Sequence, residues 1–298
     1  MELTPLNIGY ACINLTLQAN KITTNRGMIK KTFTERGVTY ASELALKNVQ
    51  DLLKIVEWNL EHGFRLFRIS SDVFPWLSEY RISDLPDFSE IRAMLEDIGS
   101  RPIRLTLHPG PFNQLAGQGR VLHNTIRDLE SQSEIFDLMR LEPSHWNKIN
   151  IHVGGTYGNK SATLARFSQN FKLLSENLRA RLTVENDDRP SLYTVADLVS
   201  LYETVGTPIV FDYFHHALNP GSQTEEDAFL TAYHTWDVRP VFHYSDSRKD
   251  HEDPTARREA HADWIYSPVN TYGKEVDIVF ESKMKELAIL QLRELIGG

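Results

Sequence analysis

The sequence predicts a single (β/α)8 barrel, a TIM barrel, over residues 1–298, and three observations predict it. Eight short apolar runs alternate with helical segments, and the connections between them are mostly short. No Gly-x-Gly-x-x-Gly phosphate loop follows the first run, which argues against a doubly wound open sheet. Histidines and carboxylates stand where most of the strands should end, and barrel active sites form at that end of the strands.

Each strand is expected where β-branched and apolar residues form a short run, as in strands that are buried on both faces. These runs are Leu6–Cys12, Phe64–Ile69, Ile103–His108, Lys148–Val153, Ala180–Asn186, the run that begins at Pro208, Val238–Tyr244 and Glu275–Glu281. Each helix is expected where apolar residues recur at helical spacing. The helices are Ser42–Glu61, Phe88–Ile98, Val121–Leu138, Lys160–Asn177, Val195–Val205, Glu225–Tyr233 and a last helix that ends near Ile296.

Composition and charge favour an ordinary globular protein of the cytoplasm. No apolar run approaches the roughly 18 residues that span a bilayer, and we expect no signal peptide. Cys12 is the single cysteine, which excludes a disulfide framework or a thiolate zinc site within one chain and favours a reducing compartment. The net charge of −8 argues against a nonspecific nucleic-acid coat protein, but the expected loop Lys21–Arg36 is basic.

The candidate site residues share one property, which is that they stand at or shortly after the end of a predicted strand. They are His108, His152, Glu185, Asp212, His215, His243 and Glu281, together with Glu79 and His261 in the loops. A single histidine at such a place is more often a hydrogen-bonding group that orients a loop, and a single carboxylate is usually paired with an arginine. Several of both in one small volume would repel one another or lose solvation, and divalent cations relieve both costs. The joint pattern therefore predicts a metal cluster.

Ligand chemistry narrows the choice of ion. Imidazole and carboxylate ligands without thiolate favour manganese, zinc or ferrous iron over magnesium alone. The candidates outnumber the ligands that one ion needs, and two-metal sites hold ions about 3.5–4 Å apart across a shared carboxylate. Glu185, on a central strand, is the expected bridging ligand.

Short segments throughout the chain resemble those of UV damage endonucleases. They are Gly9–Thr16, Phe67–Asp72, Leu107–Gly110, His152–Gly158, Glu185–Arg189, Asp212–Pro220 and Phe280–Lys283. The resemblance implies a barrel related to endonuclease IV that binds double-stranded damaged DNA and nicks it immediately 5′ to a lesion, leaving a 3′-hydroxyl and a 5′-phosphate. The implied lesions are cyclobutane pyrimidine dimers and (6-4) photoproducts, with abasic sites as a further substrate. No membrane and no obligate protein partner are implied.

The resemblance also implies roles for the site residues. Two or three divalent ions are expected, usually manganese, with zinc as the alternative, and Glu185 and Glu281 are the expected catalytic residues. Glu185 would bridge two of the ions. The other ligands fall into three sets, which are Asp212, His243 and Glu281 for one ion, His108 and His152 for a second, and His215 and His261 for a third. His216 is not assigned to an ion and is expected behind the ligands or on the phosphate side of the site.

The chain departs from the family pattern at three places. Glu79 stands where members often have a histidine, and it stays a ligand candidate because a carboxylate also binds metal. Pro111 and Phe112 stand where many members have Gln-Tyr, and a proline does not replace the hydrogen bonds of a glutamine. Val241 stands where some members have a lysine.

Contacts with DNA are expected at two kinds of residue. A lesion buried in a duplex must be flipped out, and we expect Tyr10, Asn14 and Phe112 to assist. The cations that would contact phosphates are Lys21, Arg26, Lys30 and Lys31. The plainer alternatives are that Tyr10 is an ordinary barrel residue, that Phe112 anchors a loop, and that the basic segment is only a solvated loop.

Two other functions stay open on the sequence. A sugar isomerase or epimerase of the same barrel type would use similar ligands, but it needs fewer of them and has no use for the basic loop. A noncatalytic lesion-binding protein would need only a structural metal, and structural sites are often rich in cysteine.

Overall fold

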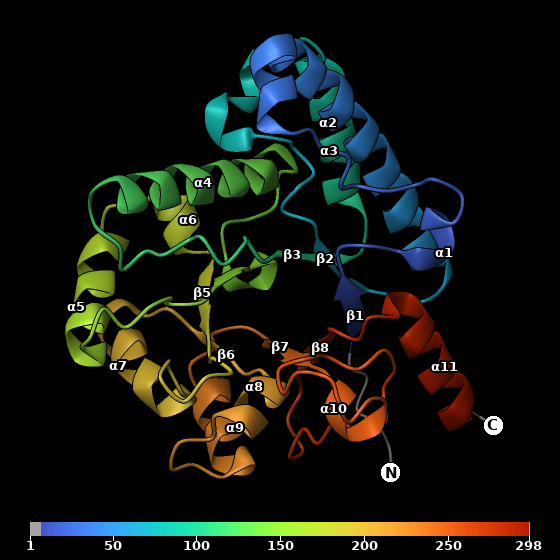
Figure 1. Cartoon of the computed structure of the whole chain (residues 1–298). Helices are drawn as coiled ribbons and strands as arrows, with labels where there is room; N and C mark the ends of the chain where they lie inside the picture. The colour runs from blue at the N-terminus through green and yellow to red at the C-terminus, as the bar shows by residue number, and fades with distance from the viewer. Residues whose placement is uncertain (1–6, 298) are drawn as a thin grey trace.

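The computed structural model describes residues 7–297, in which eight parallel strands form a barrel surrounded by helices (Figure 1). The strands are β1 Ile8–Ala11, β2 Leu66–Ile69, β3 Arg104–Leu107, β4 Ile149–Ile151, β5 Leu182–Glu185, β6 Ile209–Val210, β7 Val241–Tyr244 and β8 Asp277–Phe280. They lie in the order β6-β5-β4-β3-β2-β1-β8-β7. A parallel bridge between Asp212 and His243 joins β6 to β7, so that the barrel is nearly closed.

Helices cover the outside of the barrel and alternate with the strands. The longer helices are α2 Lys30–Glu61, α3 Phe88–Ser100, α4 Gly119–Leu138, α5 Lys160–Phe171, α7 Val195–Val205, α9 Glu225–Tyr233 and α11 Lys285–Gly297. The short ones are α1 Leu15–Gln18, α6 Glu176–Arg179, α8 Tyr213–Leu218 and α10 Arg248–His251, with 3-10 turns at Leu77–Glu79, Ile82–Asp84 and His145–Asn147. Among the helices of residues 7–297, none is long and apolar enough to cross a membrane.

The strands are buried on both faces, as their apolar runs predict. All four residues of β5 and all four of β7 are buried. Besides apolar residues, several strands carry buried polar and charged side chains, among them Arg104, Asn150 and Asp277. Near the amino end of the barrel, Arg104 donates to Asp277 at 2.8 Å with side chains only 1% and 0% exposed. This buried ion pair occupies the amino end of the barrel, so the carboxyl ends of the strands are the end that is available for a site.

The predicted barrel and its eight strands are confirmed, and the differences are at the ends of elements and in the short helices α1, α8 and α10, which the sequence did not predict. Leu6, where the first strand was expected to begin, lies outside the described residues. The helix expected over Lys160–Asn177 is wrong in extent, because it ends at Phe171 and α6 begins after Ser175, whose side chain caps it.

The expected basic loop is helical in its second half. Lys30 begins α2, which runs to Glu61 and is interrupted at Gly37, where φ is 62° and ψ is −158°. The two helical segments therefore meet at a kink, and the first segment carries Lys30 and Lys31 on a structured support.

Candidate metal centre

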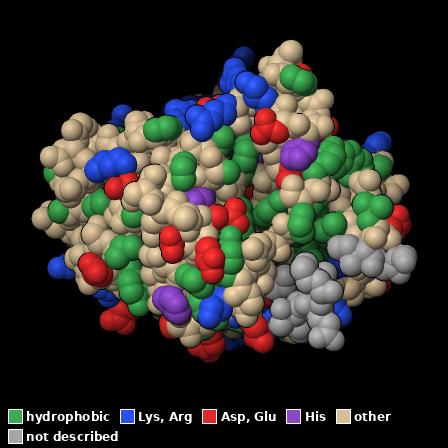
Figure 2. All heavy atoms as spheres, turned by 90° about the horizontal axis from the view of Figure 1, so that it is seen from below, with side chains coloured by type: hydrophobic (Ala, Val, Ile, Leu, Met, Phe, Trp, Pro, Cys, Tyr) green, Lys and Arg blue, Asp and Glu red, His purple; other side chains and the backbone are tan. Residues whose placement is uncertain are grey.

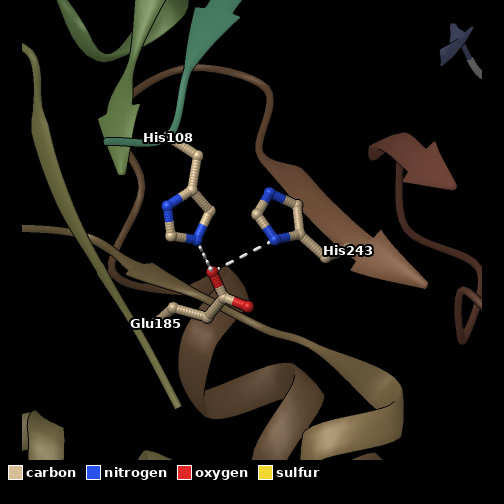
Figure 3. Close-up of side chains that lie close together, drawn as sticks. All are labelled: His108, Glu185 and His243. Atoms are coloured by element: carbon tan, nitrogen blue, oxygen red, sulfur yellow. Dashed lines mark hydrogen bonds and ion pairs between the residues drawn. The ribbon is translucent and has the colours of Figure 1, made fainter. Parts of the chain in front are cut away.

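Glu185 lies at the centre of the side chains that meet at the carboxyl ends of the strands. It ends β5 and is 1% exposed. Its Oε2 lies 3.1 Å from Nε2 of His108 and 3.1 Å from Nδ1 of His243, and both rings point at this one oxygen (Figure 3). On the other oxygen, Oε1 lies 3.2 Å from Nδ1 of His215. Nε2 of His152 is 3.9 Å from Oε2. One carboxylate is thus shared by four imidazoles.

The potential ligand atoms form three overlapping groups among the described residues, and within each group the atoms lie within 4.8 Å of one another. The groups are His108 with Glu185 and His243, His152 with Glu185 and His215, and Asp212 with His243 and Glu281. The last group is the trio expected around one ion. The other two groups place His108 with His243 and His152 with His215. The ligand sets predicted from the sequence instead place His108 and His152 on the same ion.

The donor set fits a divalent cation. Oδ2 of Asp212 and Nδ1 of His243 are both buried, and neither atom has a hydrogen-bond partner among residues 7–297. Buried polar atoms without a partner are uncommon in folded proteins and are often explained by an ion. Both residues belong to the group that includes Glu281, so a cation bound there would be a partner for these two atoms. Imidazole and carboxylate donors of this number suit manganese or zinc.

Charge is crowded around the site. Burial raises the pKa of Glu185, but the imidazoles, led by His243 and His152, outweigh it and hold that pKa well below its usual range. Burial, together with the charges of Glu185 and Glu281, raises the pKa of Asp212 to about 7 against the attraction of His215. Neighbouring carboxylates repel one another when all of them are ionised, and a bound cation would relieve that repulsion.

Two predicted ligands lie outside the three groups. Nδ1 of His261 is 3.9 Å from Oε2 of Glu281, and its ring lies 6.4 Å from that of His215. Its place at the edge of the cluster is compatible with a ligand to a further ion. Glu79 is half-exposed and lies 3.5 Å from Arg127, so its nearest charged partner is an arginine.

The structure buries two of the residues expected to contact DNA. Tyr10 has no exposed surface, and its hydroxyl donates to Asn59 at 2.5 Å while accepting from Asn14 at 2.8 Å. Asn14 is 1% exposed and also caps α1 through the amide of Leu17. These surroundings are those of barrel residues, the plainer alternative for Tyr10. Phe112 differs from both, because 89% of its surface is exposed.

Of the four basic residues predicted to contact phosphates, three are exposed and one is turned inward. Lys21, Lys30 and Lys31 are exposed. Arg26 is turned inward and lies 2.6 Å from Asp51, where it also donates to the backbone of the loop that it belongs to. Its guanidinium therefore fastens the loop to α2.

Three residues that the sequence did not single out lie against the site. Nζ of Lys148 is 3.0 Å from Nε2 of His243, Asn150 donates to Glu185, and Arg68 donates to Glu281. The sequence contains an indication for two of them, Lys148 and Asn150. Lys148, Asn150 and His152 alternate along β4 and its flanks, and side chains two apart in a strand point to the same side.

His216, which is expected behind the ligands or on the phosphate side of the site, is buried against Phe211. It is 5% exposed, and its ring centroid lies 5.4 Å from that of Phe211. Its neighbour His215 points instead at the site.

Fold and site together define a TIM-barrel protein with a buried cluster of histidines and carboxylates that could hold divalent cations. The UV-endonuclease UvdE family matches residues 6–297, and the chain belongs to this family. The UV-damage endonuclease of Schizosaccharomyces pombe is 34% identical over 307 residues, which cover 96% of this chain and 50% of that protein. The putative UV-damage endonuclease of Acanthamoeba polyphaga mimivirus is 30% identical over 304 residues, covering 96% and 90%. The chain thus spans half the length of the fission yeast relative.

Solved structures agree with the assignment. The crystal structure of SacUVDE matches with a TM-score of 0.83 at 28% identity and covers 98% of this chain and 99% of that one. Endonuclease IV from Thermus thermophilus matches with a TM-score of 0.59 at 14% identity, which shows a shared fold alone. The resemblance drawn from the sequence is confirmed.

Proposed function

We propose that this protein is a metal-dependent endonuclease that nicks UV-damaged DNA. It hydrolyses the phosphodiester immediately 5′ to cyclobutane pyrimidine dimers and (6-4) photoproducts, leaves a 3′-hydroxyl and a 5′-phosphate, and accepts abasic sites as a further substrate. Family membership supports this activity. The observation that carries it is the buried carboxylate of Glu185 with imidazole nitrogens from His108, His215 and His243 within 3.2 Å.

Two or three divalent ions, manganese first and zinc second, would be held by the three ligand groups, with Glu185 as the shared ligand. When bound, the ions would supply Lewis acidity and a water of lowered pKa. Glu281 and Glu185 are the proposed catalytic residues, and His261 would serve an ion at the edge of the cluster. Glu79 would have to leave Arg127 to join them.

The protein's own side chains hold this arrangement in place. Asn150 donates to Oε2 of Glu185 and Arg68 to Oε1 of Glu281, so each carboxylate has one oxygen fixed by a neighbour. Lys148 holds the far nitrogen of His243. Partners of this kind orient ligands before a cation arrives, which lowers the cost of binding it.

DNA must approach a protein whose net charge is −8. On the face seen from below, Asp and Glu side chains lie mostly over the lower half, and many Lys and Arg side chains lie along the upper margin (Figure 2). Local positive charge is therefore the feature that would guide the polyanion. We assign phosphate contacts to Lys21, Lys30 and Lys31, and insertion into the opened duplex to Phe112.

A plasmid assay tests the proposal. Purified protein with Mn²⁺ is incubated with irradiated and unirradiated supercoiled plasmid. We expect open circles from irradiated plasmid alone and no nicking when EDTA is present. Equal nicking of both plasmids would overturn lesion specificity, and nicking that persists in EDTA would overturn metal dependence.

The rival functions have their own outcomes in parallel assays. Binding of irradiated DNA without nicking would support a lesion-binding protein. Formation of a ketose from an aldose without nicking would support a sugar isomerase.

A further inference from the structure

We propose that Tyr157 is a second aromatic residue that stacks on DNA beside Phe112, and that Gln114 is the positioning residue that aims it. This inference rests on the proposed function. Phe112 follows His108 by four residues and Tyr157 follows His152 by five, so the two rings stand on the loops that leave β3 and β4 just beyond two candidate ligands.

Both rings face solvent at the rim of the site. Phe112 is 89% exposed and Tyr157 is 55% exposed. Single exposed apolar residues are common on protein surfaces and need no explanation. Here two aromatic rings stand on neighbouring loops at the carboxyl ends of the strands, where barrel enzymes meet their substrates. Their shared location is therefore informative.

Tyr157 is held in place although it is exposed. Its hydroxyl donates to Oε1 of Gln114 at 2.6 Å, which links the loop after β4 to the loop after β3. The guanidinium carbon of Arg166 lies 4.8 Å from the ring centroid and covers part of the ring. Tyr157 is still 55% exposed, so part of its surface remains accessible to a ligand.

Gln114 can make this contact because Gly154 leaves room for it. A Cβ at Gly154 would come within 2.9 Å of Cγ of Gln114, and the φ of Gly154 is 92°. The backbone N–H of Gln114 also donates to the hydroxyl of Thr125 on α4, so the backbone of Gln114 is anchored to that helix. Gln114 therefore links the two loops from a backbone that is fixed to α4.

The backbone of Tyr157 is strained. Its φ is 47°, in the left-handed region, which costs a residue with a side chain free energy that glycine would not lose. Burial of the ring does not offset this cost, because more than half of the residue is exposed. Strain of this kind gathers at functional sites, where the displayed orientation is used.

The chemistry of the ring favours a nucleobase as its partner. Aromatic side chains stack on bases without regard to sequence, and a nearby arginine adds cation–π and phosphate contacts. Flipping a lesion leaves unpaired bases and a gap in the duplex. Phe112 and Tyr157, joined through Gln114, would fill that gap from two loops, and we place the base opposite the lesion against Tyr157.

The test uses a duplex that carries one cyclobutane dimer, with 2-aminopurine opposite the dimer. Binding of the whole protein is followed by 2-aminopurine fluorescence with Ca²⁺ in place of Mn²⁺, and nicking is followed separately with Mn²⁺. The variants are Tyr157→Leu, Tyr157→Phe, Gln114→Leu, and the double variant of the last two. Trp146→Leu is the control, since Trp146 is 38% exposed and lies under Arg104 at the opposite end of the barrel.

We expect Tyr157→Leu to weaken binding about tenfold or more, as stacking contacts do, and to abolish the fluorescence change. Tyr157→Phe and Gln114→Leu should each weaken binding about threefold. The double variant should weaken it no further, because both substitutions remove the same hydrogen bond between Tyr157 and Gln114. Trp146→Leu should bind as the wild type does. Wild-type binding and fluorescence in Tyr157→Leu would overturn the stacking role, and additive losses in the double variant would overturn the positioning role.

Failure of the proposed function would give a different result from failure of the inference on Tyr157. If the wild-type protein does not nick irradiated DNA, the proposed function fails whatever the variants do. The fluorescence series then still decides whether Tyr157 contacts damaged DNA, because it needs no cleavage.

Discussion

Nζ of Lys148 lies 3.0 Å from Nε2 of His243, inside the barrel and on the side of the imidazole away from Glu185. Both side chains are fully buried. Burial lowers the pKa of Lys148 to about 7, with Glu185 opposing and Arg68 adding to the effect. His243 therefore has an amine at Nε2, and carboxylate oxygens of Glu185 and Glu281 lie 3.1 and 3.4 Å from Nδ1. A partner on the far nitrogen fixes the orientation of a ligating imidazole.

Replacing Lys148 with methionine should weaken the site. Methionine keeps most of the volume and removes the amine, so Nε2 of His243 loses its partner and the ring loses its fixed orientation. We expect Mn²⁺ affinity to fall about 10- to 100-fold, as for other partners of ligating histidines, when measured by calorimetry. Lys47→Met, on an exposed residue of α2, is the control and should bind as the wild type does. Unchanged affinity in Lys148→Met would show that the amine does not orient His243.

Replacing Glu185 with glutamine should remove metal and nicking together. The amide is nearly the same size but has no charge, and it would serve two of the three ligand groups poorly. We expect a loss of bound metal by elemental analysis and a fall in nicking of more than about a hundredfold, since a shared ligand counts for more than a supporting partner. Glu61→Gln, exposed at the end of α2, is the matched control. Full nicking by Glu185→Gln would rule out the bridging role.

The convergence of the site residues was predictable from the sequence because parallel strands of a barrel end on one face. His108, Glu185 and His243 each stand at the last or next-to-last position of an apolar run, so their meeting needed only the order of the strands. The short helix α8 was missed for a local reason. Its six residues are too few for a helical period to show, and Asp212 both follows a strand and caps the helix by accepting from the amide of His215.

Contacts between distant residues were not predictable from local pattern. Arg26 is separated from Asp51 by 25 positions, and nothing near either residue indicates that they pair. The burial of Tyr10 likewise follows from the tertiary contacts with Asn59 and Phe64. Alternation along a strand shows which side chains share a face, but the identity of the facing residue depends on the neighbouring strands.

Gly37→Ala should destabilise the protein. The φ of 62° and ψ of −158° at Gly37 fall in a region that is essentially restricted to glycine. A Cβ there would meet no atom within 4 Å, so the cost comes from the backbone alone. We expect the free energy of unfolding in urea to fall by about 1–3 kcal/mol. Gly27→Ala is the control, because it also meets no atom within 4 Å and its φ is not positive. Equal stability of the two variants would mean that α2 straightens at no cost.

Neutralising Lys30 and Lys31 should change how DNA binding depends on salt. Both are exposed on the first segment of α2, and the pairing of Lys31 with Glu35 at 3.9 Å is weak. Removing one phosphate contact lowers the slope of log affinity against log salt by about 0.9. Lys30→Gln with Lys31→Gln should therefore reduce that slope by about 1–2, measured by fluorescence anisotropy at several salt concentrations. Lys47→Gln with Lys172→Gln is the control pair, and an unchanged slope in the first pair would exclude this segment from the interface.

Asp51→Asn should loosen the loop that Arg26 fastens, and its effect should depend on pH. The Asp51 carboxylate is buried and accepts from Lys54, Arg26 and the amide of Thr23. Burial raises the pKa of Asp51, but these donors together hold it below its usual value. The depressed pKa means that the ion pairs stabilise the folded state above a pH of about 3.8 and are lost as the pH falls through the folded-state pKa.

We therefore expect Asp51→Asn to lower the free energy of unfolding at pH 7 by about 2 kcal/mol, the usual worth of hydrogen bonds to a charged group. The gap from the wild type should stay constant down to a pH of about 3.8 and narrow below it, because the wild-type carboxylate then becomes protonated and loses its charge. Asp97→Asn, which removes an exposed partner of Arg101, is the control and should have little effect at either pH. A gap that stays constant with pH would show that the charge of Asp51 does not fasten the loop.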